Sequence, residues 1–551
     1  MTGTDAGVRP STPRDVPHAA AHQRVRPTAA LLVALALLAV HQAFRFSALA
    51  PDGLRADLGI QYHLAQLTAG GAVPFIDFQH GWNAGSFYLG AALYLLVGGN
   101  APVWIYLFEV VTATVVAGVA LAVTAWRLRL PSSWLLGLVV AWLWLTHVPN
   151  GKYAIPMLWL ASLVPTGGVR RRLPAVVVRL VLGAVTFWLH VELAVLLAAG
   201  VALYDLFGAR GLEPRDRLLR AGAAPAAMAV ALVVQLGVYH LAGLPPGKLV
   251  ALMIGEPTAV FDDAHFGYPL FNPGSLRALV YPVSLVLPFV PVVWRRLSAP
   301  TRLAVCLHLS QALTAIRRTD EGHVAAASTL LVVVVVLAAR DLLLAAPPRF
   351  GDVRGVRRAL LAAGGALWLA LAVAAGFRVP SLVAIVGLAV VCLLGVAAAG
   401  RGDFPWAGVG AVAAAGLLLV GGLAGRTLVE LRSDRSGERA ETIAAAVGAA
   451  VERCGDGSGR AWVVPEPLGL YGALALTNPT PHYAFWYDFA AKHDEVVAQM
   501  DAGEIPLIIQ PYGWPDSMSG MVDDIEARYE VCDEIFVGEG RPLVTVWSSR
   551  E

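Results

Sequence analysis

Two carboxylates, Asp57 and Asp77, lie 20 residues apart in a short polar stretch of a chain that is otherwise strongly apolar. A carboxylate at a membrane surface can remove the proton from a hydroxyl as that hydroxyl attacks an activated carbon. If the leaving group is a polyprenyl phosphate, it departs as a stable anion, so the site needs one base and cations to hold the phosphate. The same two residues also fit a structural arrangement, in which Asp57 caps an interfacial helix and Asp77 pairs with Arg55.

A second charged cluster, R-R-T-D-E-G-H over residues 317–323, lies between two apolar segments. Charged groups between two membrane segments are costly unless they are paired or functional. Arg317 and Arg318 are candidates to hold a lipid phosphate. Asp320 and His323 are candidates to bind a sugar hydroxyl or to orient an arginine. The alternative is an ordinary charged turn at the membrane surface.

Two further groups of polar residues are of types that bind substrates or metal ions. His190 and Glu192 lie between two closely spaced apolar segments, where they serve either substrate binding or a structural polar pair. Asp262, Asp263 and His265 are of types that bind metal ions, although their spacing matches no specific metal motif. A divalent metal ion is therefore left open as a cofactor.

The composition indicates an integral membrane protein. Of 551 residues, 57% are hydrophobic and only 15% are charged, and the mean hydropathy is +0.64. Soluble domains carry about 25% charged residues. The arginines are scattered in short loops and form no basic face, which argues against a nucleic-acid partner.

Apolar runs of roughly 15–23 residues predict about 13 membrane-spanning helices. They cover residues 28–48, 102–125, 134–148, 153–167, 174–189, 191–207, 221–243, 277–294, 303–316, 324–341, 359–376, 381–399 and 406–425. The run over residues 85–99 is short and interrupted by glycines, which favours a helix at the interface over a crossing.

The arginines then orient the chain. Without a crossing at residues 85–99, the basic clusters around Arg127, Arg170, Arg215, Arg295 and Arg354 fall on one side of the membrane. We therefore expect a cytoplasmic N-terminus and an outer C-terminus. The candidate polar groups described above, together with Lys152, would all face outward.

The chain divides into a cytoplasmic tail (residues 1–27), a transmembrane body (28–426) that includes the first outer loop (49–100), and a C-terminal extracytoplasmic α/β domain (427–551). In the last of these we expect helices near 436–453, 488–500 and 521–529, and strands over 461–465, 505–511 and 542–547. Cys454 and Cys532 both lie there, and could form a disulfide if the domain faces an oxidising compartment.

The first outer loop resembles that of GT-C-fold glycosyltransferases, in particular bacterial membrane transferases related to protein mannosyltransferases and aminoarabinose transferases. The likeness rests on D-L-G-x-x-Y-x-L-A over residues 57–65, P-F-x-D-F-x-x-G over 74–81 and S-F-Y-L-x-A-A-L-Y-L-L-V-G over 86–98. The R-x-D-E-G-H turn and the C-terminal domain are also similar to parts of this group.

The resemblance implies that Asp57 is the base, that Asp77 helps to bind the acceptor or a metal, and that Arg318 contacts phosphate or sugar. His80, three residues after Asp77, joins them as a candidate substrate ligand. Relatives often carry an arginine at the place of His190 and another near Glu109. In this chain the cations that can take over that phosphate contact are Lys152, Arg317 and Lys248.

Together these features predict an inverting glycosyltransferase in the bacterial plasma membrane, with a GT-C-like fold. Its donor would be a polyprenyl-phosphate sugar, and its acceptor a hydroxyl of a glycan, lipid or protein on the outer face. The competing hypothesis is a flippase or exporter of lipid-linked oligosaccharides that performs no chemistry. A transporter should place polar residues along a path near the middle of the bilayer, whereas this chain gathers them at outer helix ends.

Overall fold

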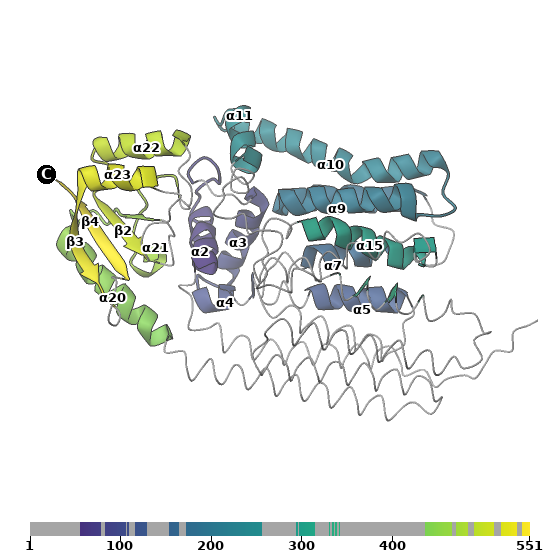
Figure 1. Ribbon diagram of the computed structural model, residues 1–551, viewed down its shortest axis with the longest axis horizontal. Coiled ribbons are helices and arrows are strands. Elements are labelled where there is room, and N and C mark those ends of the chain that lie inside the picture. Colours follow the sequence, from purple (N-terminus) through teal and green to yellow (C-terminus); the bar gives the residue numbers. More distant parts are fainter. Residues whose placement is uncertain are drawn as a thin grey trace, which may run out of the picture.

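The computed structural model describes two parts of the chain, a helical part and a C-terminal α/β unit (Figure 1). The residues that it describes are 56–78, 83–105, 107–108, 116–128, 154–164, 172–255, 294–295, 297–313, 330, 333–334, 337–338, 341, 436–464, 470–482, 490–511, 519–536 and 543–550.

Helices of the described part run side by side and form a bundle (Figure 1). They bury a shared core of leucine, valine and alanine side chains, in which Leu121, Leu160, Leu197 and Leu307 are fully buried. The helices are α5 (Ala117–Arg127), α7 (Ala154–Leu163), α8 (Arg172–Leu189), α9 (Val191–Leu203), α10 (Pro214–Leu241) and α15 (Ala299–Ala312).

Within the described ranges, two helical segments are long and apolar enough to cross a membrane, Val191–Gly208 and Pro214–Leu241. The first combines α9 with the π-helical turn η3 (Tyr204–Gly208). The second carries exposed valines along one side, a composition that suits contact with lipid. Both agree with predicted crossings, whereas most of the other predicted crossings fall wholly or largely outside the described residues.

The helices of the first loop run across one end of this bundle (Figure 1). They are α2 (Ala56–Ala69), α3 (Ala84–Leu96) and the short α4 (Ala101–Ile105). The 13 residues of α3 span about 20 Å, which is less than the roughly 30 Å of a bilayer core. Its length and its direction agree with the prediction that residues 85–99 make no crossing.

The side chain of Asn83 joins the first loop to two bundle helices. It caps α3 by accepting the Ala84 N–H at 2.8 Å, and it donates to the carbonyl of Phe187 on α8. Gln235 on α10 donates to the same amide oxygen at 2.9 Å. Both amides are buried, so these hydrogen bonds form where water cannot replace them.

Gly85 lies next to this anchor, where α3 touches the end of α8. A Cβ at this position would overlap the carbonyl oxygen of Trp188 and lie 2.6 Å from carbon Cδ2 of its ring. Glycine is therefore the residue that allows α3 to approach the α8 backbone this closely. On the outer side of the contact, the rings of Tyr88 and Trp188 stack 6.4 Å apart.

Several arginines gather at the opposite end of the bundle and bind backbone carbonyls there. Arg127 donates to the carbonyl of Ala161 at 2.6 Å, and Arg302 donates to that of Gly208 at 2.8 Å. Nearby, Arg179 forms a buried bidentate ion pair with Asp205. The predicted basic side and the first loop thus lie at different ends of the bundle.

The α/β unit contains a four-stranded sheet in the order β1-β2-β4-β3. Strands β1 and β2 are parallel, and the other two pairings are antiparallel. All five residues of β2 are buried, as expected for a central strand that is covered on both faces. The strands are β1 (Trp462–Val463), β2 (Leu507–Pro511), β3 (Tyr529–Ile535) and β4 (Val544–Ser549).

Helices cover both faces of this sheet (Figure 1). Helix α20 (Ser436–Cys454) packs on one face, where Val447 meets Ile509 and Val546. Helices α22 (Ala490–Asp501) and α23 (Ser519–Arg528) pack on the other, against Ile508. The short α21 (Leu470–Ala473) follows β1.

The three predicted helices and three predicted strands of this region are present, with small shifts in their ends. Strand β3 was not predicted. Its sequence, Y-E-V-C-D-E-I, is rich in charge, and only its first and last residues are buried. An edge strand with a solvated face lacks the apolar pattern from which strands are predicted.

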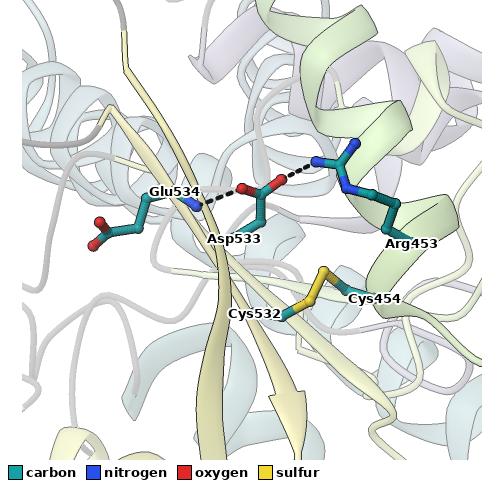
Figure 2. The surroundings of a disulfide bond; sticks show 5 residues. All are labelled: Arg453, Cys454, Cys532, Asp533 and Glu534. Carbon is teal, nitrogen blue, oxygen red and sulfur yellow. Dashed lines mark hydrogen bonds and ion pairs between the residues drawn. A yellow bond between two sulfur atoms is a disulfide. The ribbon is translucent and has the colours of Figure 1, made fainter.

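A disulfide between Cys454 and Cys532 joins the end of α20 to β3, with the two Cα atoms 6.0 Å apart (Figure 2). Beside it, the guanidinium of Arg453 pairs with the carboxylate of Asp533 (Figure 2). The Glu534 N–H donates to the other Asp533 oxygen at 2.9 Å. These contacts fasten the edge strand to the helix that begins the unit.

We expect Cys532→Ala to destabilise the α/β unit by about 2–4 kcal/mol, because the disulfide closes a long loop. Limited proteolysis of the purified full chain should then cut this unit faster. Cys306→Ala, which removes a free buried cysteine of the bundle, should leave that cleavage unchanged.

Maleimide labelling of freshly denatured protein provides the matching chemical test. Of the four cysteines, two should react before reduction and four afterwards. Labelling of all four without reductant would show that the bond does not form in the cell.

We expect Gly85→Ala to cost about 1–3 kcal/mol, because the new methyl group overlaps the α8 backbone. The measurement is the melting temperature of the purified protein in detergent. Gly237→Ala is the matched control, since nothing lies within 4 Å of a Cβ at this α10 position. Equal melting temperatures for Gly85→Ala and wild type would contradict the close approach of α3 to α8.

Candidate active site

Helix α2 carries Asp57 in its first turn and is fixed against the rest of the first loop. The ring of Tyr62 packs edge-on against Trp104 at 5.5 Å, and its hydroxyl donates to the carbonyl of Gly99. The Trp104 indole N–H donates to the carbonyl of Gly90 at 2.8 Å. The backbone that bears Asp57 is thus part of a rigid three-helix layer at the end of the bundle. The side chain of Asp57 lies outside the described residues.

Asp77 closes a tight turn that follows α2. Its carboxylate accepts the Val73 N–H at 2.6 Å, and its own N–H donates to the Val73 carbonyl at 2.9 Å. The side chain is exposed, which leaves room for a second interaction of the carboxylate. Within the part of the chain that the structure describes, Asp77 therefore has one partner, the backbone of its own turn. The predicted alternative partner, Arg55, is outside the described residues.

Two buried phenylalanines hold this turn in place. Phe75 has a φ of +68°, a conformation that costs energy for a residue with a Cβ, and its ring packs edge-on against Tyr239 of α10 at 5.7 Å. Phe78 packs edge-on against Phe87 of α3 at 5.3 Å. The burial of both rings offsets the strained backbone, so the exposed Asp77 has a defined position.

A cation lies on the neighbouring element. Helix α11 (Pro246–Val250) and the π-helical turn η4 (Ala251–Gly255) follow α10, in the stretch between the predicted crossings 221–243 and 277–294. Leu249 of α11 shares a buried cluster with Phe75, which brings α11 next to the Asp77 turn. Lys248 is exposed on α11. It therefore belongs to the same end of the bundle as the first-loop acids.

His190 and Glu192 lie where α8 passes into α9, at this same end. The Leu193 N–H points to Nδ1 of His190 at 3.4 Å, so the imidazole caps α9. Glu192 is exposed in the first turn of α9, where a carboxylate is favoured by the helix dipole. Both residues thus have a local structural role, and their predicted contact with substrate stays a prediction.

The other predicted site residues lie outside the described part of the chain, so their convergence with α2 remains a prediction. They are His80, Lys152, Arg317, Arg318, Asp320 and His323, together with the possible metal ligands Asp262, Asp263 and His265. Among the described residues, no cluster of three histidine, cysteine, aspartate or glutamate side chains has the geometry of a metal site.

Four residues that hold the first loop in place were not predicted from the sequence. Asn83 and Gln235 fix the loop to the bundle, and His63 and Tyr471 join it to the α/β unit. The rings of His63 and Tyr471 stack with centroids 5.4 Å apart and planes 14° from parallel. Burial lowers the pKa of His63 to about 4, so this imidazole is neutral at pH 7. Asn83 does precede an apolar run, a known helix-start signal, but its partners are far away in the chain.

Comparison with known proteins places the fold. No protein-family model and no curated protein sequence matches the chain. Among solved structures, ArnT from Cupriavidus metallidurans bound to undecaprenyl phosphate matches with a TM-score of 0.53 and 16% identity, over 94% of this chain and 97% of that one. The apo structure of the same protein matches with a TM-score of 0.51 and 16% identity, over 94% and 98%.

The match extends over nearly the whole of both chains, although few residues are identical. Similarity at this level concerns the fold. It confirms the resemblance that the first loop suggested, and the chain has a GT-C-like fold similar to that of the membrane protein ArnT.

Proposed function

We propose that this protein is an integral-membrane, inverting glycosyltransferase that transfers a sugar from a polyprenyl-phosphate donor to a hydroxyl acceptor on the outer face. One observation carries the proposal, the near-full-length similarity in fold to a protein solved with undecaprenyl phosphate. The first loop supports it independently, because it holds Asp57 and Asp77 in a rigid layer at one end of an apolar helical bundle.

In this mechanism Asp57 accepts the proton of the acceptor hydroxyl as its oxygen attacks the anomeric carbon of the donor sugar. The new glycosidic bond forms as the bond from that carbon to the phosphate oxygen breaks. The electron pair of the broken bond leaves with the polyprenyl phosphate. A single displacement inverts the anomeric centre, and the departing phosphate needs no added proton.

Cations are needed to stabilise the departing phosphate. Lys248 is suited by its place on α11, next to the Asp77 turn. Arg317, Arg318 and Lys152 are the further candidates from the sequence. Asp77 supports the site by holding the 73–77 turn, and its second carboxylate oxygen, for which the described residues provide no hydrogen bond, is available to the acceptor or to a metal ion.

The proposal also assigns each end of the bundle to one side of the membrane. The first loop and the turn at His190 lie at one end of the bundle, and carbonyl-bound arginines lie at the other. Positive residues favour the cytoplasmic side. We therefore assign the arginine-rich end to the cytoplasm and the first loop to the outer face of a bacterial plasma membrane.

We expect Asp57→Asn to lower sugar transfer by about 10²–10⁴-fold, the usual contribution of a general base. The measurement is mass analysis of polyprenyl-phosphate sugars in a deletion strain that carries wild-type or variant chains. The deletion strain should accumulate one such lipid, and wild type should clear it. Asp494→Asn, which alters an exposed carboxylate of α22, is the matched control and should also clear it. Clearance by Asp57→Asn at the wild-type rate would remove Asp57 from the mechanism.

A further inference from the structure

A cleft of about 450 Å³ lies between α2 and the α/β unit. This volume is within the range of small-molecule sites, roughly 300–1,000 Å³. One wall consists of His63, Gln66, Leu67 and Gly70 of the first loop, and the opposite wall includes Tyr471 and Leu476. The cleft therefore exists only where the two distant parts of the chain meet.

Most of the first-loop wall is one face of α2, and Gly70 and Ala72, just after the helix, complete it. Positions 63, 66, 67 and 70 follow the spacing of one side of a helix. Position 66 is nine residues, or about two and a half turns, beyond position 57, so the two positions lie on opposite sides of α2. Nine residues also advance roughly 14 Å along the helix axis, so the Gln66 side of the cleft is displaced from the backbone of Asp57 both around and along α2.

Among the described residues, the walls are mostly apolar and carry no formal charge. Gln66 offers an amide, which also interacts with the imidazole of His63, and Leu67, Ala72 and Ala475 supply apolar surface beside it. The rings of His63 and Tyr471 are buried and stacked face to face, so they expose little surface to the cleft. His63 is neutral at pH 7 because burial lowers its pKa. The described wall residues provide no counter-charge for a phosphate or a carboxylate, whose burial without a partner is costly.

On the side of the α/β unit, a hydrogen bond and buried side chains fix the wall of the cleft. The Val463 N–H donates to the hydroxyl of Tyr471 at 2.8 Å, which ties the ring to β1. Leu476 is buried in the cluster that includes Leu64 and Phe78 of the first loop. A ligand would thus meet walls that are already in place, which lowers the cost of binding.

We infer that this cleft binds a neutral saccharide, namely a part of the acceptor glycan that lies away from the reacting hydroxyl. Sugar rings combine hydroxyls that suit an amide with apolar faces that suit leucine and alanine side chains. The assignment of the saccharide to the acceptor rests on the proposed function. The neutral-saccharide site itself rests on the cleft alone.

The test is binding of the purified full chain, in detergent, to an array of neutral and anionic glycans. We expect wild type to bind neutral members. Ala72→Phe, at the edge of the cleft, and Gln66→Leu, which removes the amide, should each lower that binding about tenfold or more. Gln499→Leu on α22 is the matched control and should bind as wild type does. Asp57→Asn should also bind normally.

The melting temperature of each variant shows whether it is folded. If Ala72→Phe melts well below wild type, glycan binding by Gln66→Leu alone tests the inference. The inference is overturned if wild type binds no neutral glycan, if it prefers anionic ones, or if folded cleft variants bind as wild type does. Normal sugar transfer by Asp57→Asn would instead overturn the proposed base and leave the saccharide cleft standing.

Discussion

The amide of Asn83 keeps the first loop across the end of the bundle. It is buried, and it uses an N–H to bind α8 while its oxygen accepts from α10 and from the start of α3. Leaving one such buried group without a partner costs about 1–3 kcal/mol. The contact at Gly85 depends on the same placement, since α3 can touch α8 only where no Cβ intervenes. The position of α2, and of the residue proposed as base, follows from this anchor.

The α/β unit contributes to the same support. Its Tyr471 packs on His63 of α2, more than 400 residues earlier in the chain. Leu64 and Phe78 of the first loop share a buried cluster with Val447 and Ile509 of the unit. Helix α2 is therefore held on one side by α3 and α4 and on another by the C-terminal unit. A change in the unit can reach the proposed catalytic layer through this direct contact.

Elements with a regular apolar pattern could be predicted from the sequence. Helices α8, α9 and α10 could be predicted from long apolar runs, and β2 from a short run of apolar residues that turns out to be buried. Helix α3 could be separated from the crossings by its shortness, its glycines and the distribution of arginines along the chain. Strand β3 could not be found in this way, because its middle is exposed and charged. Its position depends on pairing with β4 and on the disulfide to α20.

The sequence by itself determined the apolar helical class, the GT-C-like resemblance of the first loop and the acids that suit base catalysis. Only the tertiary structure decided the partners of those elements. Asn83 and Gln235 are 152 residues apart, and neither amide has a local pattern that names the other. Local spacing encodes helices and strands because neighbouring residues share a face, whereas contacts between distant segments depend on how whole elements pack. The cleft between α2 and the α/β unit is of this second kind, and no stretch of sequence contains it.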